Sequence, residues 1–386
     1  MKARRVFGGV ALSGVVAVTI ALSAAVGSSQ ESGQTATWAA MRGLFVVVSN
    51  LYRYSLNADA FEDPKNHEEI ARLLVALTED SGQLKEHGGG LDPSFDFVRR
   101  SIARDAQDAL DGFRDANYVG SRFIVGQITE NCVTCHTKVP AVREFEPGKE
   151  FLDAINVKNF PPAVRGKLQV ASRQFSDAMK TYEETLLSPN VTAEDLVTFN
   201  TFENYLRLSI GAMNDTKRPA STLTEFVSRP DMPETIKAQA RVWIKSLETL
   251  NLEPAKGEEL GAARRMVTEA RAKTTSASDR SGMVEFIGSI TLVHRYLRSN
   301  PQNDVVLAEA YYLLGVAESY VSHSFWISET DYLLEKSIRQ APKSEVAKQA
   351  LAFLEDYRSS TSNVTPARAV PEGQTSIKDL RKLTER

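Results

Sequence analysis

Apolar residues recur at spacings of three and four over most of this 386-residue chain, and runs that alternate apolar and polar residues are scarce. A spacing of three and four places side chains on one face of an α-helix, whereas strict alternation is the pattern of a half-buried strand. Long segments rich in Ala, Leu, Glu, Lys and Arg favour helix as well. The sequence therefore predicts an all-α fold, and its length allows two helical domains.

Four helical segments with short connections are predicted between residues 33 and 140. Their apolar positions are, in order, Trp38, Met41, Leu44, Phe45, Val48 and Leu51; Ile70, Leu73, Leu74, Leu77 and Leu84; Phe95, Val98, Ile102, Ala109 and Phe113; and Ile124, Val125 and Ile128. The run His87-Gly88-Gly89-Gly90 should end the second helix. Four helices joined by short loops imply an up-down-up-down bundle.

The only two cysteines of the chain stand in the sequence Cys132-Val133-Thr134-Cys135-His136, on the fourth predicted helix. This is the attachment motif of a covalent c-type haem. Two thiols on adjacent turns of a helix reach the two vinyl groups of one porphyrin, and the imidazole of the next residue points at the iron. We therefore expect one haem c, with thioether bonds from Cys132 and Cys135 and with His136 as the proximal iron ligand.

The cysteine pair has two alternative interpretations, a redox-active disulfide and a zinc site. A redox-active Cys-x-x-Cys disulfide normally begins a helix that follows a strand, and no strand pattern precedes Cys132. A zinc site needs a fourth ligand, and the sequence has no second Cys-x-x-Cys and no His-x-x-x-His. Haem attachment is the favoured interpretation.

The segment 33–140 resembles the class II c-type cytochromes, which are cytochrome c prime and its low-spin relatives. The resemblance rests on a bundle of four helices and on the position of Cys132–His136 at the end of the last one, because class I cytochromes carry the motif near the N-terminus. It covers little more than a quarter of the chain. The chain departs from the family after the motif, where Val139-Pro140 should stop the helix early.

The other face of the haem has two candidate ligands. Bundle geometry places Met41 at the level of His136, and in the low-spin members of the resembled family a methionine of the first helix is the second iron ligand. Met41 is also explained as an ordinary core residue between Trp38 and Phe45. His87, just past the second helix, is the rival ligand, although a histidine beside three glycines also suits a solvated cap. If neither binds, a five-coordinate iron could take up nitric oxide or carbon monoxide.

The remainder of the chain is predicted to be a second helical domain over 161–358. It follows a linker over 141–160, in a stretch rich in charge and proline, with one short helix predicted over 150–155. Two groups of residues fall close to the spacing of tetratricopeptide repeats: Gly166, Phe175, Ala178, Tyr182 and Pro189, and, more loosely, Tyr311, Leu314, Gly315, Tyr332, Leu333 and Pro342. Further helices are predicted over 193–213, 233–250, 257–273 and 283–298. We expect a degenerate tetratricopeptide-like α-solenoid, curved and elongated, with a concave surface for a partner. An irregular helical domain without a groove is the alternative.

The two ends of the chain carry other signals. Lys2, Arg4 and Arg5 precede an apolar stretch over 6–26, which is the pattern of a secretory signal over 1–28; an uncleaved membrane anchor is the alternative. Covalent haem attachment also takes place outside the cytoplasm, so a periplasmic location follows. The last residues, 359–386, are rich in Ser, Thr, Pro and Gly and are predicted to be a flexible tail with a short helix over 377–383.

The net charge of the chain bears on whether it binds nucleic acid. The chain has 46 basic and 49 acidic residues. Removal of the signal leaves 43 basic residues against the same 49 acidic ones, a net charge of −6. A mildly acidic chain without a basic cluster is not expected to bind nucleic acid.

These features together predict a periplasmic mono-haem protein that transfers single electrons and docks to a redox partner or a membrane respiratory assembly through its helical repeats. A gas-binding or gas-sensing haem protein is the second hypothesis. A scaffold with a mainly structural haem is the third. An enzyme is disfavoured, because a c-type peroxidase or nitrite reductase needs a second haem or a distal acid and base.

Overall fold

A computed structural model describes residues 39–86, 93–138, 145–276, 278–299, 301–321, 329–361 and 375–385. All secondary structure in these ranges is helical. The predicted all-α class is therefore confirmed for the part of the chain that the structure describes.

The first group of helices contains the four that the apolar spacing predicted and one that it did not. The predicted four are a helix over 39–55, α3 (His67–Gly82), α4 (Pro93–Arg114) and α5 (Tyr118–Thr137). Short 3-10 turns, Pro64–Asn66 and Gln83–Glu86, flank α3, and the additional helix is α2 (Ala58–Glu62). Asn117 caps α5 by accepting a hydrogen bond from the backbone N–H of Gly120 at 3.1 Å.

The hydrophobic core of this group extends beyond residue 140. Helix α6 (Glu146–Ala154), the turn Val157–Asn159 and helix α7 (Pro162–Ala171) add Phe151, Leu152, Phe160, Val164 and Leu168 to the buried cluster formed by the first helices. The ring of Phe151 lies 6.0 Å from that of Phe45. The residues over 145–160 are thus part of the core and do not form a free linker; residues 139–144 lie outside the described ranges.

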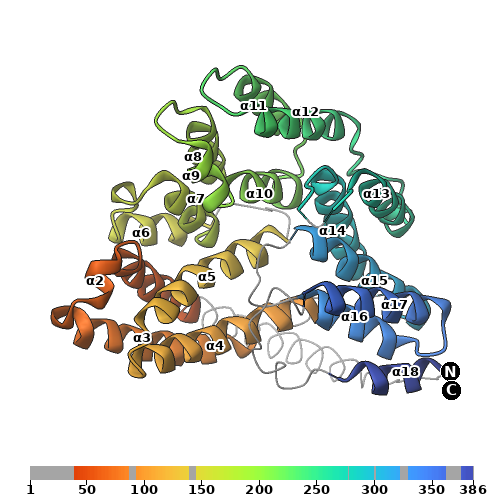
Figure 1. The fold of residues 1–386 in the computed structure, drawn as a ribbon, viewed down its shortest axis with the longest axis horizontal. Helices are drawn as coiled ribbons and strands as arrows, with labels where there is room; N and C mark the ends of the chain where they lie inside the picture. The colour runs from red at the N-terminus through yellow and green to blue at the C-terminus, as the bar shows by residue number, and fades with distance from the viewer. Residues whose placement is uncertain are drawn as a thin grey trace, which may run out of the picture.

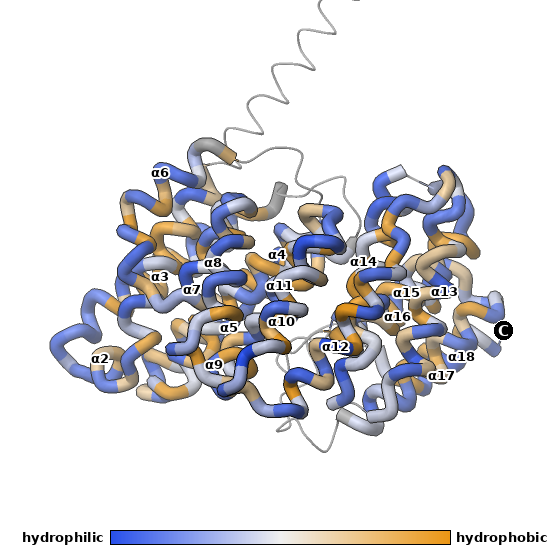
Figure 2. Tube along the Cα trace, turned by 90° about the horizontal axis from the view of Figure 1, so that it is seen from above, coloured by the Kyte–Doolittle hydropathy of each residue, from blue (hydrophilic) through white to orange (hydrophobic). Residues whose placement is uncertain are grey.

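The following helices run in an arc (Figure 1). They are α8 (Phe175–Leu187), α9 (Ala193–Thr198), α10 (Thr201–Leu206), the π-helix Arg207–Ala212, α11 (Lys217–Val227), α12 (Glu234–Thr249), α13 (Glu259–Lys273), α14 (Met283–Leu297), α15 (Asp304–Val321), α16 (Glu329–Gln340) and α17 (Glu345–Thr361). The stretches predicted here from their period are helical, although 193–213, predicted as one helix, is divided into α9, α10 and the π-helix. Helices α11 and α17 are additional. Hydrophobic segments concentrate where helices face one another, and hydrophilic residues prevail at the loops (Figure 2).

A glycine lies at two helix crossings, between α7 and α8 and between α15 and α16, as the repeat-like spacing predicted. A Cβ atom at Gly166 of α7 would lie 2.8 Å from the ring of Tyr182 on α8. A Cβ atom at Gly315 of α15 would lie 2.9 Å from the side chain of Leu334 on α16. Glycine is therefore required for the close approach of the helices at both crossings.

The end of the arc returns to the first group of helices. The ring of Phe97 on α4 stacks on that of Tyr332 on α16, with 5.2 Å between the ring centroids, and the guanidinium of Arg100 lies 5.3 Å from the same tyrosine ring. Between the two ends, the C-terminal end of α5 points toward the middle of the arc (Figure 1). The inner side of the arc therefore contacts the chain's own α5, where an open concave surface for a partner was expected.

The C-terminal segment also differs from the expected flexible tail. Helix α17 continues to Thr361, and α18 (Ile377–Glu385) covers the short helix predicted over 377–383. Leu380 of α18 is fully buried in a small cluster with Leu334 and Leu354. Residues 375–385 are thus packed against α16 and α17.

The apolar stretch over 6–26 lies outside the described residues. Within those residues, none of the helices combines the length and the apolar content that membrane crossing requires.

Candidate haem site

The two cysteines and the histidine occupy the last two turns of α5. Cys132 and Cys135 are one turn apart, His136 follows, and the helix ends at Thr137, as Val139-Pro140 predicted. Both thiols are partly buried and neither is in a disulfide. Burial, together with the neighbouring thiol Cys135, raises the pKa of the Cys132 thiol to about 12. The Cys132 thiol therefore lacks the low pKa that is typical of the reactive thiol in a redox-active disulfide motif.

A cavity opens beside this part of α5, and its empty space of about 650 Å³ includes volume that is open to solvent. Pockets that hold cofactors and other small ligands have mostly apolar walls. The walls come from the helix over 39–55, the turn Gln83–Glu86, α4, α5 and α7. They are formed by Met41, Leu44, Phe45, Val48, Leu84, Phe95, Val98, Arg99, Ile102, Thr129, Cys132, Cys135, His136, Leu168 and Ala171.

His136 has its ring oriented by a hydrogen bond from outside the predicted bundle. Its Nδ1 atom lies 3.1 Å from the carbonyl oxygen of Val170 on α7. A carbonyl oxygen can only accept, so Nδ1 carries the proton and donates it. In the neutral imidazole the other nitrogen, Nε2, then carries no proton, which is the tautomer that second-shell partners give to iron-ligating histidines.

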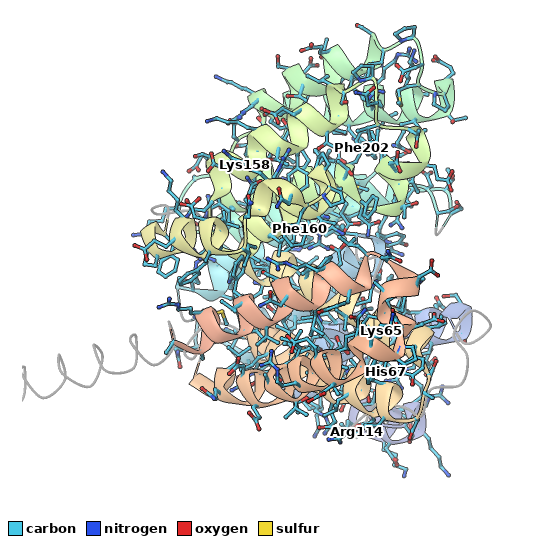
Figure 3. All side chains as sticks on the ribbon, turned by 90° about the vertical axis from the view of Figure 1, so that its left-hand side faces the viewer. Lys65, His67, Arg114, Lys158, Phe160 and Phe202 are labelled. Atoms are coloured by element: carbon cyan, nitrogen blue, oxygen red, sulfur yellow. The ribbon has the colours of Figure 1, made fainter. Side chains whose placement is uncertain are left out.

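The candidate second ligands of the iron differ in their position relative to the cavity. Met41 lines the cavity together with His136, as bundle geometry predicted, and its side chain is partly buried. His87 lies outside the described residues. His67 stands with Lys65 and Arg114 at another end of the group (Figure 3). Its ring packs 5.3 Å from that of Phe113, and it does not line the cavity.

Sequence reasoning missed a charged residue of the cavity wall. Arg99 of α4 lines the cavity among apolar residues and forms an ion pair with Asp96, and its side chain is about one quarter exposed. An arginine at the edge of the cavity could bind a carboxylate of the cofactor. The sequence signal was present, because Arg99 interrupts the apolar stripe that Phe95, Val98 and Ile102 form on α4.

The residues directly after His136 are held by elements far along the chain. A Cβ atom at Gly211 of the π-helix would collide with the carbonyl oxygen of Thr137. The backbone carbonyl of Lys138 accepts a hydrogen bond from Arg298 at 3.3 Å. The Lys138 ammonium group lies 2.6 Å from both carboxylate oxygens of Glu329, which is the first residue of α16.

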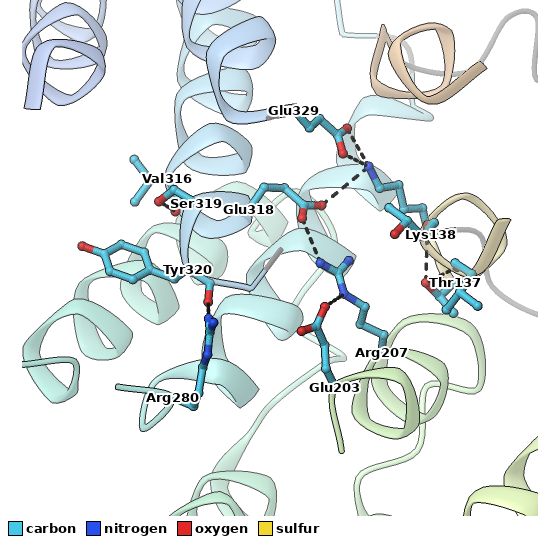
Figure 4. A network of polar contacts seen from close by, with 12 residues as sticks. Thr137, Lys138, Glu203, Arg207, Arg280, Val316, Glu318, Ser319, Tyr320 and Glu329 are labelled. Carbon is cyan, nitrogen blue, oxygen red and sulfur yellow. Dashed lines mark hydrogen bonds and ion pairs between the residues drawn. The ribbon is translucent and has the colours of Figure 1, made fainter. Parts of the chain in front are cut away.

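Lys138 begins a chain of buried charges that crosses the middle of the arc (Figure 4). Its ammonium group is 3.6 Å from Glu318 of α15, and Glu318 accepts a hydrogen bond from Arg207 at 3.0 Å. Arg207 also binds Glu203 at 3.1 Å. The side chains of all five residues, Glu329 included, are at most 9% exposed.

Burial and pairing act in opposite directions on the carboxylates of this chain. Burial opposes the ionisation of Glu318, but the charges of Arg207 and Lys138 outweigh it and hold the pKa of Glu318 at about 2. Burial dominates at Glu203 and raises its pKa to about 7 despite the charge of Arg207. Burial also raises the pKa of Glu329.

Comparison with known protein families, curated proteins and solved structures found no match to this chain. In the described parts of the chain, no three His, Cys, Asp or Glu side chains come together as a metal-ion site. The side chains of Cys132, Cys135 and His136 therefore do not converge on a single ion. They border one wall of a cavity whose lining is mostly apolar, and residues of this chemistry fit a porphyrin attached along α5.

Proposed function

We propose that the protein is a mono-haem c-type cytochrome that transfers single electrons. The observation that carries the proposal is the shared cavity of Cys132, Cys135, His136 and Met41. Cys132 and Cys135 would hold the haem by thioether bonds, and His136 would bind its iron through Nε2. The haem would supply the one-electron redox chemistry. The helices over 39–55, α3, α4 and α5 would then form a class II cytochrome-like four-helix bundle, extended by α6 and α7.

The protein's own residues would do three things for the haem. The apolar walls, which include Leu44, Val98 and Leu168, would limit the contact of water with the haem and so limit the reorganisation that accompanies a change of iron charge. The carbonyl of Val170 fixes the orientation and tautomer of His136. Met41, which lines the same cavity, would be a second iron ligand, and a thioether ligand raises the reduction potential.

Residues 161–358 would form a tetratricopeptide-like solenoid that belongs to the same folded unit as the haem site. Since its inner side contacts the end of α5, we propose that a periplasmic redox partner docks on its outer surface. An exported location is supported by the basic and apolar pattern over 1–28 and by the haem motif itself.

Absorption spectra of the oxidised and reduced protein, recorded with and without carbon monoxide, test the proposal. A closed, six-coordinate iron with Met41 bound should show little change when carbon monoxide is added to the reduced protein. Ready carbon monoxide binding by the reduced wild-type protein would contradict Met41 ligation and would favour the gas-binding hypothesis instead.

A further inference from the structure

A buried ion pair connects the two helices that meet at His136. Lys167 of α7 is paired with Glu130 of α5, and their side chains are 7% and 19% exposed. Lys167 also lies 5.8 Å from the ring of Phe199. Burial alone would lower the pKa of the Lys167 ammonium group, but the charge of Glu130 outweighs burial and raises it, so Lys167 keeps its positive charge at neutral pH.

The ion pair and the hydrogen bond to His136 are two contacts between the same two helices. On α7, Lys167 precedes Val170 by three residues and Ala171 by four, so the three residues share the face that meets α5. On α5, Glu130 precedes His136 by six residues, which is somewhat less than two turns. A slide or rotation of α7 that separated Lys167 from Glu130 would therefore also move the Val170 carbonyl away from Nδ1 of His136.

A stabilising role alone explains this pair poorly. Removing two charges from water costs several kcal/mol for each ion, and an apolar pair of similar volume is often as stable. Buried charged pairs are better attested as devices that fix one register among several. His136 requires one particular register of α7 on α5, because a Val170 carbonyl displaced by about 1 Å from Nδ1 no longer makes the hydrogen bond.

We propose that Lys167 and Glu130 are positioning residues for the iron ligand, which hold α7 in the register that lets the Val170 carbonyl accept the Nδ1 proton of His136. The inference rests on the proposed haem function. Through this bond the pair sets the tautomer and the basicity of the imidazole that binds iron. Two residues outside the attachment motif, one of them in the predicted solenoid, thereby belong to the haem site.

The test is the solvent exchange of the His136 Nδ1 proton in the oxidised haem protein, where the iron shifts its NMR signal away from all others. Lys167→Met should speed this exchange about tenfold, because the proton loses its acceptor. Lys167→Arg and the charge-swapped double variant Glu130→Lys/Lys167→Glu keep an ion pair and should restore slow exchange. The neutral double variant Glu130→Gln/Lys167→Met should exchange as fast as the single variant, although its net charge equals that of the wild type.

Arg165→Met is the matched control, because Arg165 lies on the same helix and pairs with the exposed Glu184 at 3.9 Å. It should leave the exchange rate unchanged. Exchange in Lys167→Met that equals the wild-type rate, or equals that of Arg165→Met, would overturn the proposal. If the wild-type protein carried no haem, the proposed function would be refuted instead. The exchange of the His136 Nδ1 proton, measured on ¹⁵N-labelled histidine in the same variants, would then still decide the role of Lys167.

Discussion

Replacement of Lys138 by methionine should strongly destabilise the protein. The Lys138 side chain is 2% exposed, and its ammonium group contacts both carboxylate oxygens of Glu329 at 2.6 Å and lies 3.6 Å from Glu318. Methionine fills similar space but leaves two buried carboxylates with one fewer cation. Removal of one partner from a buried ion pair costs about 3–5 kcal/mol, and we expect a loss of this size for Lys138→Met.

The stability lost in Lys138→Met should increase as the pH rises. Burial already raises the pKa of Glu329, and removal of Lys138 raises it further. A carboxyl group whose pKa is higher in the folded than in the unfolded state destabilises the fold at high pH, and this cost falls as the pH drops and the group takes up a proton. The difference between Lys138→Met and the wild type should therefore be larger at pH 8 than at pH 5.

Urea unfolding, monitored by far-UV circular dichroism, measures these differences in unfolding free energy. The midpoints are compared only where the dependence of the free energy on urea concentration is unchanged. Lys348→Met is the control, because Lys348 and its partner Glu345 are 58% and 73% exposed. This exposed pair should contribute no more than about 0.5 kcal/mol. Equal stability of Lys138→Met and Lys348→Met would refute the claim that the chain of buried charges ties the end of α5 to α15 and α16.

Two further changes test neighbouring parts of the account. Glu203→Gln should stabilise the protein above pH 7 by up to about 3 kcal/mol, since burial raises the pKa of Glu203 from 4.5 to about 7 and each unit corresponds to 1.36 kcal/mol. The gain should vanish below pH 4.5, and a gain that is independent of pH in urea titrations would contradict this origin. Met41→Ala should open the cavity and allow the reduced protein to bind carbon monoxide; spectra identical to those of the wild type would show that Met41 only packs.

The local features of this protein follow from its sequence. Apolar residues at spacings of three and four predicted α3, α4, α5 and most helices of the arc, because each helix buries one face against its neighbours. The motif Cys132–His136 and the position of Met41 also required only local spacing and the geometry of a bundle. The glycines at the helix crossings, Gly166 and Gly315, were found for the same reason.

The boundary between the two predicted domains was harder to place from sequence. Pro147 and Pro162 suggested a linker, yet each lies in the first turn of a helix, α6 and α7, where proline loses no hydrogen bond. Phe151 then supplies a buried ring to the core of the first group. Proline marks helix starts as well as breaks, and the sequence alone did not distinguish them.

The contacts that complete the site join residues distant in the chain. His136 and Val170 are 34 positions apart, and Lys138 and Glu329 are 191 apart. Nothing in the local pattern near Lys138 indicates that its charge is buried, because a lysine at the end of a helix is ordinarily solvated and favourable to the helix dipole. Such pairings depend on the register of packed helices, which a single sequence does not specify.

The central claim is that haem is bound covalently at Cys132 and Cys135. The direct measurement is the mass of the denatured protein after expression in a periplasm that has a functional haem-attachment system. The account predicts a mass increase equal to one haem for the wild type and no increase for Cys132→Ala/Cys135→Ala, with the haem absorbance following the mass. A wild-type protein that carries no covalent haem under these conditions would contradict the account.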